Sequence, residues 1–313
     1  MNPSFPTASF PTGEPAGGLD RRRIEHAVAG ARVRDLHVTL VGAGSGGFPV
    51  MQQLAMLGVR RWDLFDPDVL QPHDLVKHPA RRADLARSKV DVAQEWLLDR
   101  NPTAEVRSHT ADVITVPELL GGSLARTDLV VCAVDTAGAR GFVNERCVEH
   151  QVPCATGTVF RTGMGGTVHL YLPGYSGCFA CLESWTRTHG HDIDGAADLT
   201  GDERHRVYGL GERDYSASGL ATDIALVASF HAALCTSLLC AGASPVVPPV
   251  TFTWLTFSTR RVPGVFDARF AAERVLLRPQ RDCYLRCALP RRSTGTRRPA
   301  SRHGGRGSGS PWV

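Results

Sequence analysis

The stretch LHVTLVGAGSGG, residues 36–47, decides the fold of this chain. It is a run of apolar and β-branched residues that stops in glycines at positions 42, 44, 46 and 47. An apolar run bounded by glycine predicts a buried strand over 37–41. Apolar residues then recur at helical spacing from Phe48 to Leu57, and Gly58 is a typical helix stop. The stretch therefore predicts a strand, a glycine-rich turn and a helix.

The same alternation continues along the chain. We expect further strands at 62–66, 104–109 and 128–134, and helices at 88–101 and 137–150. Alternating strands and helices are typical of an α/β fold with a Rossmann-like, mainly parallel sheet flanked by helices on both faces.

The pattern changes at Pro153. The segments 153–160, 166–172 and 250–257 read as strands with few helices between them. This pattern predicts antiparallel C-terminal strands that continue the sheet, interrupted by a polar loop over 183–218.

The composition allows one large domain with a sizeable core. The chain has 313 residues, a mass of 33.8 kDa and 42% hydrophobic residues. We expect a folded domain over 19–290, between a disordered N-terminal segment at 1–18 and a basic disordered tail at 291–313. No secretion signal pattern opens the sequence, so we expect a cytoplasmic protein.

Charge and hydropathy argue against two kinds of partner. The tail at 291–313 holds six arginines and no acidic residue. The rest of the chain lacks the basic stripe of nucleic-acid-binding proteins, so we do not expect a nucleic-acid partner. Residues 224–243 are apolar and long enough to span a bilayer, but they include His231 and lack flanking Lys or Arg. We therefore expect a core or interface helix there and no membrane.

The glycine turn indicates an anion site. At Gly42, Gly44 and Gly47, backbone amides and the positive end of a helix dipole can face a phosphate at close range. Asp66, about 20 residues beyond the turn, follows the second strand, where a carboxylate can accept hydrogen bonds from ribose hydroxyls. A carboxylate that only caps the turn is the alternative for Asp66. These features alone fit an NAD(P)-dependent oxidoreductase and an ATP-binding enzyme equally.

The sequence DPDVLQPHDLVKHPARRADLARSKVDVAQEWLLDRNP, residues 66–102, separates these two classes. It resembles the ThiF/MoeB/HesA family of ubiquitin-like-protein activating enzymes, in a divergent bacterial form. The family signature is a D-x-D pair, an N-L-x-R-Q/H motif, a Lys that opens a helix, and an N-P pair near the helix end. The positions that fall on this signature in order are Asp66, Asp68, Asp74, Lys77, His78, Lys89, Asn101 and Pro102. The resemblance extends from residue 20 to residue 287.

The resemblance implies an adenylation domain that binds ATP and Mg²⁺. It implies that the glycine loop and Asp66 hold the nucleotide and that Lys77 and Lys89 bind its phosphates. Asp135, in the turn after the strand at 128–134, corresponds to the family aspartate that helps to bind Mg²⁺ beside the α-phosphate. A metal on a polyphosphate requires such a hard oxygen ligand.

Two positions of this nucleotide-binding block depart from the family. Asp74 stands in place of the family Asn and brings a negative charge near the polyphosphate. Lys77 stands in place of the family Arg and lacks its bidentate fork. Asp68, between Asp66 and Asp74, keeps the family residue.

The resemblance also implies partners. An arginine near the N-terminus often reaches the neighbouring subunit's site in this family. Arg21, Arg22 and Arg23 lie in that region, and we take Arg22 as the candidate without a reason to prefer it over its neighbours. A homodimer is expected, with the helix at 224–243 as an interface element.

Four of the nine cysteines form two local pairs. Cys178 and Cys181 form C-x-x-C, and Cys283 and Cys287 form C-x-x-x-C. Four thiolates in two pairs can bind a tetrahedral Zn²⁺, whose role would be structural, as it is in the family. The extra residue in the second pair departs from the family spacing. We expect core packing for the remaining cysteines, which are Cys132, Cys147, Cys154, Cys235 and Cys240.

These features predict ATP-dependent adenylation of the C-terminal carboxylate of a ubiquitin-like protein. Family members that form a thioester carry a cysteine between the first C-x-x-C pair and the long helix, where this chain offers Ser216 and Ser218. We therefore expect the reaction to stop at the acyl-adenylate, which passes to a sulfur or amine acceptor or to a conjugating enzyme. The alternatives are a non-catalytic scaffold member of the family, a relative that adenylates a peptide or small molecule, and an NAD(P)-dependent oxidoreductase.

Overall fold

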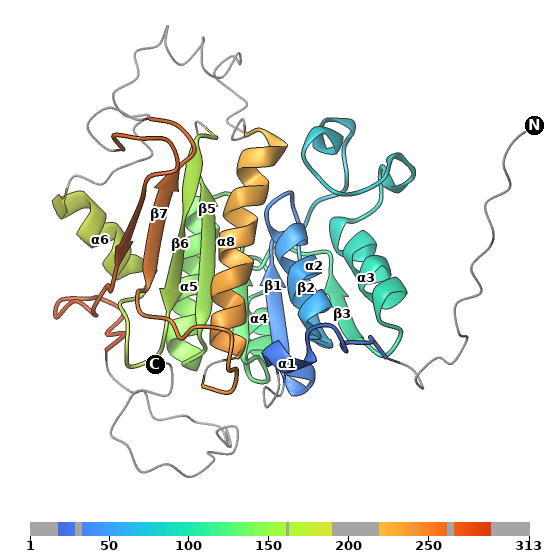
Figure 1. Cartoon of the computed structure of the whole chain (residues 1–313), viewed down its shortest axis with the longest axis horizontal. Coiled ribbons are helices and arrows are strands. Elements are labelled where there is room, and N and C mark those ends of the chain that lie inside the picture. Colours follow the sequence, from blue (N-terminus) through green and yellow to red (C-terminus); the bar gives the residue numbers. More distant parts are fainter. Residues whose placement is uncertain are drawn as a thin grey trace, which may run out of the picture.

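The computed structural model describes residues 18–28, 33–160, 163–189, 219–240, 242–261 and 266–288. An eight-stranded sheet crosses it in the order β3-β2-β1-β4-β5-β6-β7-β8 (Figure 1). The strands from β3 to β5 pair in parallel, and β6, β7 and β8 extend the sheet in antiparallel pairing. The predicted Rossmann-like fold with antiparallel C-terminal strands is confirmed.

The strands follow the predicted apolar runs. Their bounds are β1 His37–Val41, β2 Arg61–Phe65, β3 Glu105–His109, β4 Leu129–Cys132, β5 Cys154–Val159, β6 Gly165–Tyr171, β7 Trp254–Ser258 and β8 Ala272–Val275. Only β8 is unpredicted. Its residues are half-buried or exposed, so it has no apolar run, and pairing with β7 defines it.

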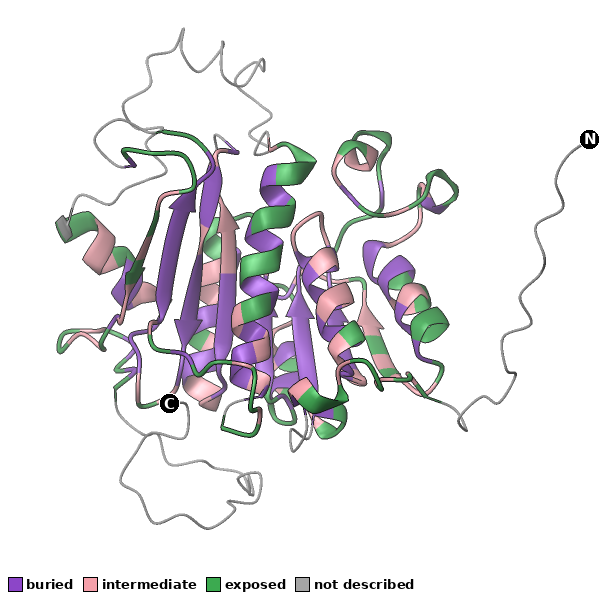
Figure 2. Ribbon diagram, in the orientation of Figure 1, coloured by how far each residue is buried: buried purple, intermediate pink, exposed green. Residues whose placement is uncertain are grey.

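Helices cover both faces of the sheet. They are α1 Glu25–Val28, α2 Gly47–Leu57, α3 Lys89–Arg100, α4 Pro117–Leu124, α5 Ala137–His150, α6 Phe179–His189 and α8 Ala221–Leu239. The helices α2, α3 and α8 cover one face, and α4, α5 and α6 cover the other (Figure 1). The sheet between the two layers is buried over most of its length (Figure 2).

The loop expected over 183–218 begins later than predicted. Helix α6 extends to residue 189, because its Trp185 packs edge-on against Trp254 of β7, with ring centroids 5.2 Å apart. The remainder of that loop, including Ser216 and Ser218, lies outside the described residues. So do residues 1–17 of the expected N-terminal segment and the expected tail at 291–313.

Helix α8 packs closely on the sheet. A Cβ added at Gly157 of β5 would lie 2.5 Å from Nδ1 of His231, and one at Gly166 of β6 would lie 2.7 Å from Val227. The His231 Nε2 atom donates a hydrogen bond to the Ala155 carbonyl at 3.0 Å. Among the described residues α8 is the one helix whose length and composition would suit a bilayer, and half of that apolar window is buried. This packing agrees with the expected core helix.

Candidate nucleotide site

The predicted site residues gather at one edge of the sheet. Gly42 follows β1, Asp66 follows β2 and Asp135 follows β4, and these three strands are neighbours. The connections from β1 through β3 place α2 and α3 on one face, whereas those from β3 through β5 place α4 and α5 on the other. The direction of winding therefore reverses between β1 and β4, which is where open α/β sheets bind ligands.

The four glycines of the turn have two different roles. Gly42 has φ +94°, and a Cβ there would lie 2.7 Å from the Ala133 carbonyl oxygen. A Cβ on Gly47 would lie 1.9 Å from the Gly42 oxygen. These two glycines are required by the packing of the turn. A Cβ on Gly44 or Gly46 would meet no described atom within 4 Å, so packing does not require glycine at either position.

The turn leaves the start of α2 uncapped by any side chain. The N-cap residue is Gly46, and within the described part of the chain no side-chain hydrogen bond caps the helix. The Phe48 amide donates to the Gly44 carbonyl at 3.0 Å and Pro49 has no N–H, so the amides available to an anion are those of the loop around Gly44 and Gly46. Bare backbone of this kind before a helix is suited to act as an anion cradle.

Asp66 organises the turn. Its Oδ2 atom accepts a hydrogen bond from the Ala43 amide at 2.7 Å, and its Oδ1 atom accepts one from the Asp68 amide at 2.9 Å. Burial raises the pKa of Asp66, although those amides and Lys89 act in the opposite direction. Asp66 thus caps the turn after β2. A carboxylate has about four acceptor positions, so this role is compatible with an additional bond to a ribose hydroxyl.

Lys89 opens α3 as predicted and lies beside three carboxylates. Its Nζ atom lies 2.8 Å from Oδ2 of Asp68, and the residue is buried. Burial would lower the pKa of Lys89, but the hydrogen bond to Asp68 and the charges of Asp66 and Asp74 outweigh burial and raise it. Lys89 is therefore a cation held beside the carboxylates that follow β2.

The two family departures lie next to each other: Asp74 is in the turn η2 Pro72–Val76, and Lys77 follows it as the C-cap. Asp74 accepts a hydrogen bond from the Gln71 amide at 2.9 Å, so its carboxylate caps its own turn. Lys77 is half-buried and lines a hollow of about 320 Å³ together with Ser45, His78 and Ala221. Lys77 and Lys89 are the two lysines of the entire chain, in which the other basic side chains are arginines and histidines.

Asp135 lies exposed directly beyond β4. Its backbone is held by Arg140 of α5, which donates from Nη2 to the Asp135 carbonyl at 3.0 Å and from Nε to the Val134 carbonyl at 3.1 Å. The side chain of Thr136 caps α5 at the Ala139 amide. The turn is therefore fixed while the Asp135 carboxylate faces solvent, as a metal-binding carboxylate requires.

Arg22 lies away from this chain's own glycine loop. It forms an exposed ion pair with Asp20 at 2.6 Å, next to α1. The preceding Arg21 donates to the Leu57 carbonyl at the C-terminal end of α2, whereas the glycine loop opens the N-terminal end of that helix. These contacts place Arg22 near the C-terminal end of α2 and not at the glycine loop.

Sequence reasoning missed several supporting residues. Arg140 belongs to the turn that contains Asp135, but its contact with carbonyls is not visible in a motif. Ser45 and Gly46 lie inside the glycine loop, and only the structure distinguishes open from packed positions there. Asp84 anchors the loop before Lys89, but nothing in the sequence distinguishes it from the many charged residues of the surface.

The four predicted zinc ligands come together. The Sγ atoms of Cys178, Cys181, Cys283 and Cys287 all lie within 4.8 Å of one another, with distances of 3.6, 3.7 and 4.0 Å between three of the pairs. Four sulfurs placed tetrahedrally about 2.3 Å from a zinc ion would lie about 3.8 Å apart. The donor set fits Zn²⁺, despite the extra residue in the second pair, and joins the start of α6 to the segment at 281–288.

Curated relatives match about half of the chain. Ubiquitin-like modifier-activating enzyme 5 of Dictyostelium discoideum is 29% identical over 160 residues, which covers 48% of this chain and 42% of the relative. The enzyme of the same name from Oryza sativa subsp. japonica is 29% identical over 161 residues, with coverage of 48% and 38%. The chain thus spans about two fifths of the length of these relatives.

Solved structures share the fold at lower identity. E. coli MccB with MccA-N7isoASN has a TM-score of 0.61 and 18% identity, and MccB with ATP has 0.58 and 17%, each covering 81% of this chain and 67% of the other. PaaA has a TM-score of 0.57 and 18% identity, covering 78% of this chain and 74% of its own. The model of the ThiF family matches residues 22–263, which is most of the sequence. The chain belongs to the ThiF family.

Proposed function

We propose that the chain is an ATP-dependent adenylyltransferase that activates the C-terminal carboxylate of a ubiquitin-like protein or a peptide. The observation that carries the proposal is the anion cradle between β1 and β4, with Lys89 on one side and Asp135 on the other. Two relatives support it by their names: one class activates ubiquitin-like modifiers, and MccB has been solved with ATP and with the peptide MccA. Family membership favours this reading over an NAD(P)-dependent oxidoreductase.

In the proposed reaction an oxygen of the substrate carboxylate attacks the α-phosphorus of ATP. The bond from the α-phosphorus to the bridging oxygen breaks, pyrophosphate leaves, and the product is an acyl-AMP. Little covalent chemistry is needed from the protein, so positioning and charge neutralisation dominate. The amides at Gly44 and Gly46 orient the phosphates, and Lys77 and Lys89 neutralise them.

Asp135 would hold Mg²⁺, which supplies further positive charge at the phosphates. The exposed carboxylate on a fixed turn fits this role, because Mg²⁺ prefers hard oxygen ligands and retains several waters. The Asp68 side chain is exposed, so an incoming phosphate could replace it as the partner of Lys89. The buried part of the lysine would not need to move.

The burial of the cysteines supports an acceptor outside the chain. All nine cysteines are described, and the five outside the zinc cluster are buried. Burial raises the pKa of Cys132 to about 12 and that of Cys147 well above its ordinary value, so neither forms a thiolate at neutral pH. We propose that the acyl group passes to an external sulfur or amine nucleophile, or to a conjugating enzyme.

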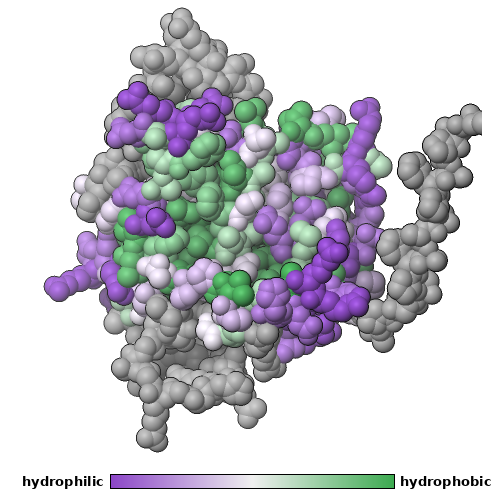
Figure 3. Space-filling view, viewed as in Figure 1, coloured by the Kyte–Doolittle hydropathy of each residue, from purple (hydrophilic) through white to green (hydrophobic). Residues whose placement is uncertain are grey.

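We further propose a cytoplasmic homodimer. Helix α8 exposes Leu226 and Phe230, and Figure 3 shows apolar surface over α8 and the neighbouring strands. A second copy on such a surface would bury these side chains. We propose that Arg22 of one copy reaches the nucleotide site of the other.

Exchange between ATP and radiolabelled pyrophosphate tests the proposal. Full-length protein is incubated with Mg–ATP and purified ubiquitin-like proteins or short peptides with free C-termini. Exchange that depends on one of these substrates supports the proposal. Nucleotide binding without exchange for any substrate would favour a scaffold, and a change in NADH absorbance would favour an oxidoreductase.

A further inference from the structure

One histidine of the family signature has a distinct set of contacts. The imidazole of His78 is buried between its own loop and the glycine loop. Its Nδ1 atom lies 3.1 Å from the Ala80 amide, and its Nε2 atom lies 3.0 Å from the Ala43 carbonyl oxygen. An amide can only donate, so Nδ1 is the unprotonated acceptor. Nε2 therefore carries the hydrogen and donates to Ala43.

We propose that His78 is a positioning residue that orients the glycine loop for the nucleotide phosphates. The inference rests on the proposed function. His78 would act through the Ala43 peptide group and would not touch the nucleotide.

The backbone of Ala43 is held on both sides of its Cα atom. Its amide donates to Asp66 at 2.7 Å and its carbonyl accepts from His78 at 3.0 Å. In the segment that follows, Gly44 and Gly46 are the positions where packing leaves bare backbone facing open space. Because glycine backbone is conformationally permissive, the direction of these amides depends on the contacts that fix the loop at each end. The Phe48 amide donates to the Gly44 carbonyl at 3.0 Å on the helix side, and the contacts of Ala43 with Asp66 and His78 fix the strand side.

The ring itself is fixed in place. The ring of Phe48, in the first turn of α2, meets the His78 ring edge-on with centroids 5.0 Å apart. The His78 amide donates to the Asp74 carbonyl. Burial lowers the pKa of His78, which keeps the ring neutral and Nδ1 able to accept.

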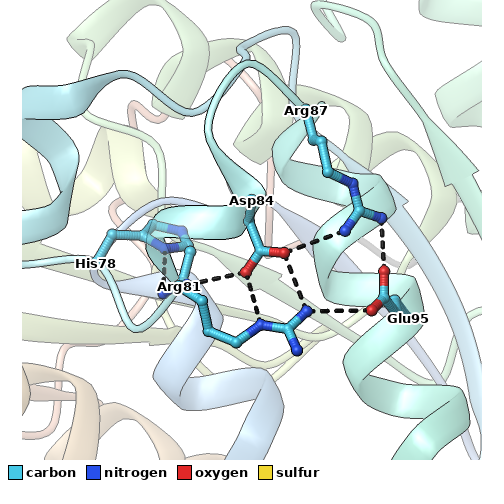
Figure 4. A network of polar contacts seen from close by, with 6 residues as sticks. His78, Arg81, Asp84, Arg87 and Glu95 are labelled. Carbon is cyan, nitrogen blue, oxygen red and sulfur yellow. Dashed lines mark hydrogen bonds and ion pairs between the residues drawn. The ribbon is translucent and has the colours of Figure 1, made fainter.

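The loop that holds His78 is anchored to α3. Asp84 is buried and accepts hydrogen bonds from the side chains of Arg81 and Arg87, and both arginines also contact Glu95 of α3 (Figure 4). A network of one buried carboxylate, two arginines and a helical glutamate restrains the loop more firmly than a single surface pair would. His78 therefore joins the glycine loop to a restrained segment.

Three substitutions separate positioning from space filling. His78→Gln keeps one donor and one acceptor on a side chain of similar length. His78→Asn has an acceptor that reaches the Ala80 amide, but it is too short for the Ala43 carbonyl. His78→Leu fills the space and offers neither group. His231→Gln is the control, because His231 is another buried histidine bonded to a backbone carbonyl, away from the glycine loop.

Two measurements on the full-length protein test the inference. Calorimetry gives the affinity for Mg²⁺ and the α,β-methylene analogue of ATP, and hydrogen exchange gives the protection of the amides at 43–47. We expect His78→Leu and His78→Asn to lose about tenfold in affinity, the size of one buried hydrogen bond, and to exchange faster at 43–47. His78→Gln and His231→Gln should stay within about threefold of wild type.

The outcomes are separable. Wild-type affinity and protection in His78→Asn, whose fold is checked by thermal melting, would overturn the inference even if His78→Leu does not fold. If wild-type protein binds no nucleotide, the proposed function fails. In that case, faster hydrogen exchange of the amides at 43–47 in His78→Asn would still support the restraint of the loop by His78. Unaltered hydrogen exchange would contradict that restraint.

Discussion

The ammonium group of Lys89 lies 2.8 Å from the carboxylate of Asp68, and the two side chains are 11% and 63% exposed. The buried lysine thus has an exposed partner that a phosphate can replace. Lys89→Met keeps most of the side-chain volume and removes the charge. We expect pyrophosphate exchange to fall about 10²-fold or more, because a preorganised charge at the phosphates is lost.

The control for Lys89→Met is Arg100→Met at the opposite end of α3, where the guanidinium stacks on Trp96. Arg100→Met should leave exchange unchanged. Equal losses in both variants would show that the effect comes through helix α3 and not through the phosphates.

Gly44 and Gly47 form a matched pair of alanine substitutions. Gly47→Ala places a methyl group 1.9 Å from the Gly42 oxygen, so we expect it to lower the free energy of unfolding by about 1–3 kcal/mol or more. Gly44→Ala meets no described neighbour and should change that free energy by less than about 0.5 kcal/mol. It should instead weaken nucleotide binding, because the methyl group blocks close approach to the backbone. Urea unfolding and calorimetry measure the two effects, and unchanged nucleotide affinity in Gly44→Ala would contradict the proposed cradle.

Asp135 is exposed, so its role can be removed without disturbing the fold. Asp135→Asn should retain the wild-type melting temperature and lose most pyrophosphate exchange, with a higher Mg²⁺ requirement for the activity that remains. Asp99→Asn, an exposed aspartate near the end of α3, is the control and should match wild type in both assays. Exchange that persists in Asp135→Asn at low Mg²⁺ would remove Asp135 from the site.

The cysteine cluster predicts one zinc ion per chain. Cys178→Ser should purify without zinc and melt at a lower temperature, because the link between α6 and the segment at 281–288 is lost. Cys147→Ser alters a buried cysteine outside the cluster and should retain its zinc. Elemental analysis of both variants decides the matter, and equal zinc content in the two would contradict the assignment.

Buried histidines predict loss of stability in acid. Burial lowers the pKa of His231 to about 4, whereas an unfolded histidine titrates near 6.5. The unfolded state therefore binds the extra proton first, and stability falls as the pH drops from about 6.5 to about 4, by up to about 3 kcal/mol for this residue. His169, whose pKa burial also lowers to about 4, adds to the same loss.

His231→Gln removes one of these titrating groups. Its free energy of unfolding, measured in urea across the same pH range, should depend less steeply on pH than that of wild type. Coincident slopes would show that His231 does not titrate as its burial implies.

The sequence predicts most of the framework because strand ends carry local signals. The apolar run before Gly42, the helix stop at Gly58 and the opening of α3 at Lys89 each depend on neighbouring residues only. In a parallel sheet the ends of neighbouring strands meet, so the proximity of Gly42, Asp66 and Asp135 follows from the fold class.

Contacts between distant segments could not be predicted in the same way. Strand β8 forms only because β7 pairs with it, and α6 extends because Trp185 meets Trp254. Likewise, no local pattern shows that His78 reaches the Ala43 carbonyl or that Arg140 holds the Asp135 backbone. These contacts depend on how segments that are distant in the sequence fold against each other.

Lysine footprinting tests the nucleotide site most directly, because Lys77 and Lys89 are the only lysines in the sequence. Full-length protein is reductively methylated with and without Mg²⁺ and the α,β-methylene analogue of ATP, with NAD⁺ as a comparison, and modification is read by mass spectrometry. The account predicts that the ATP analogue protects both lysines and that NAD⁺ protects neither. Equal methylation with and without saturating Mg²⁺–nucleotide, or protection by NAD⁺ alone, would contradict it.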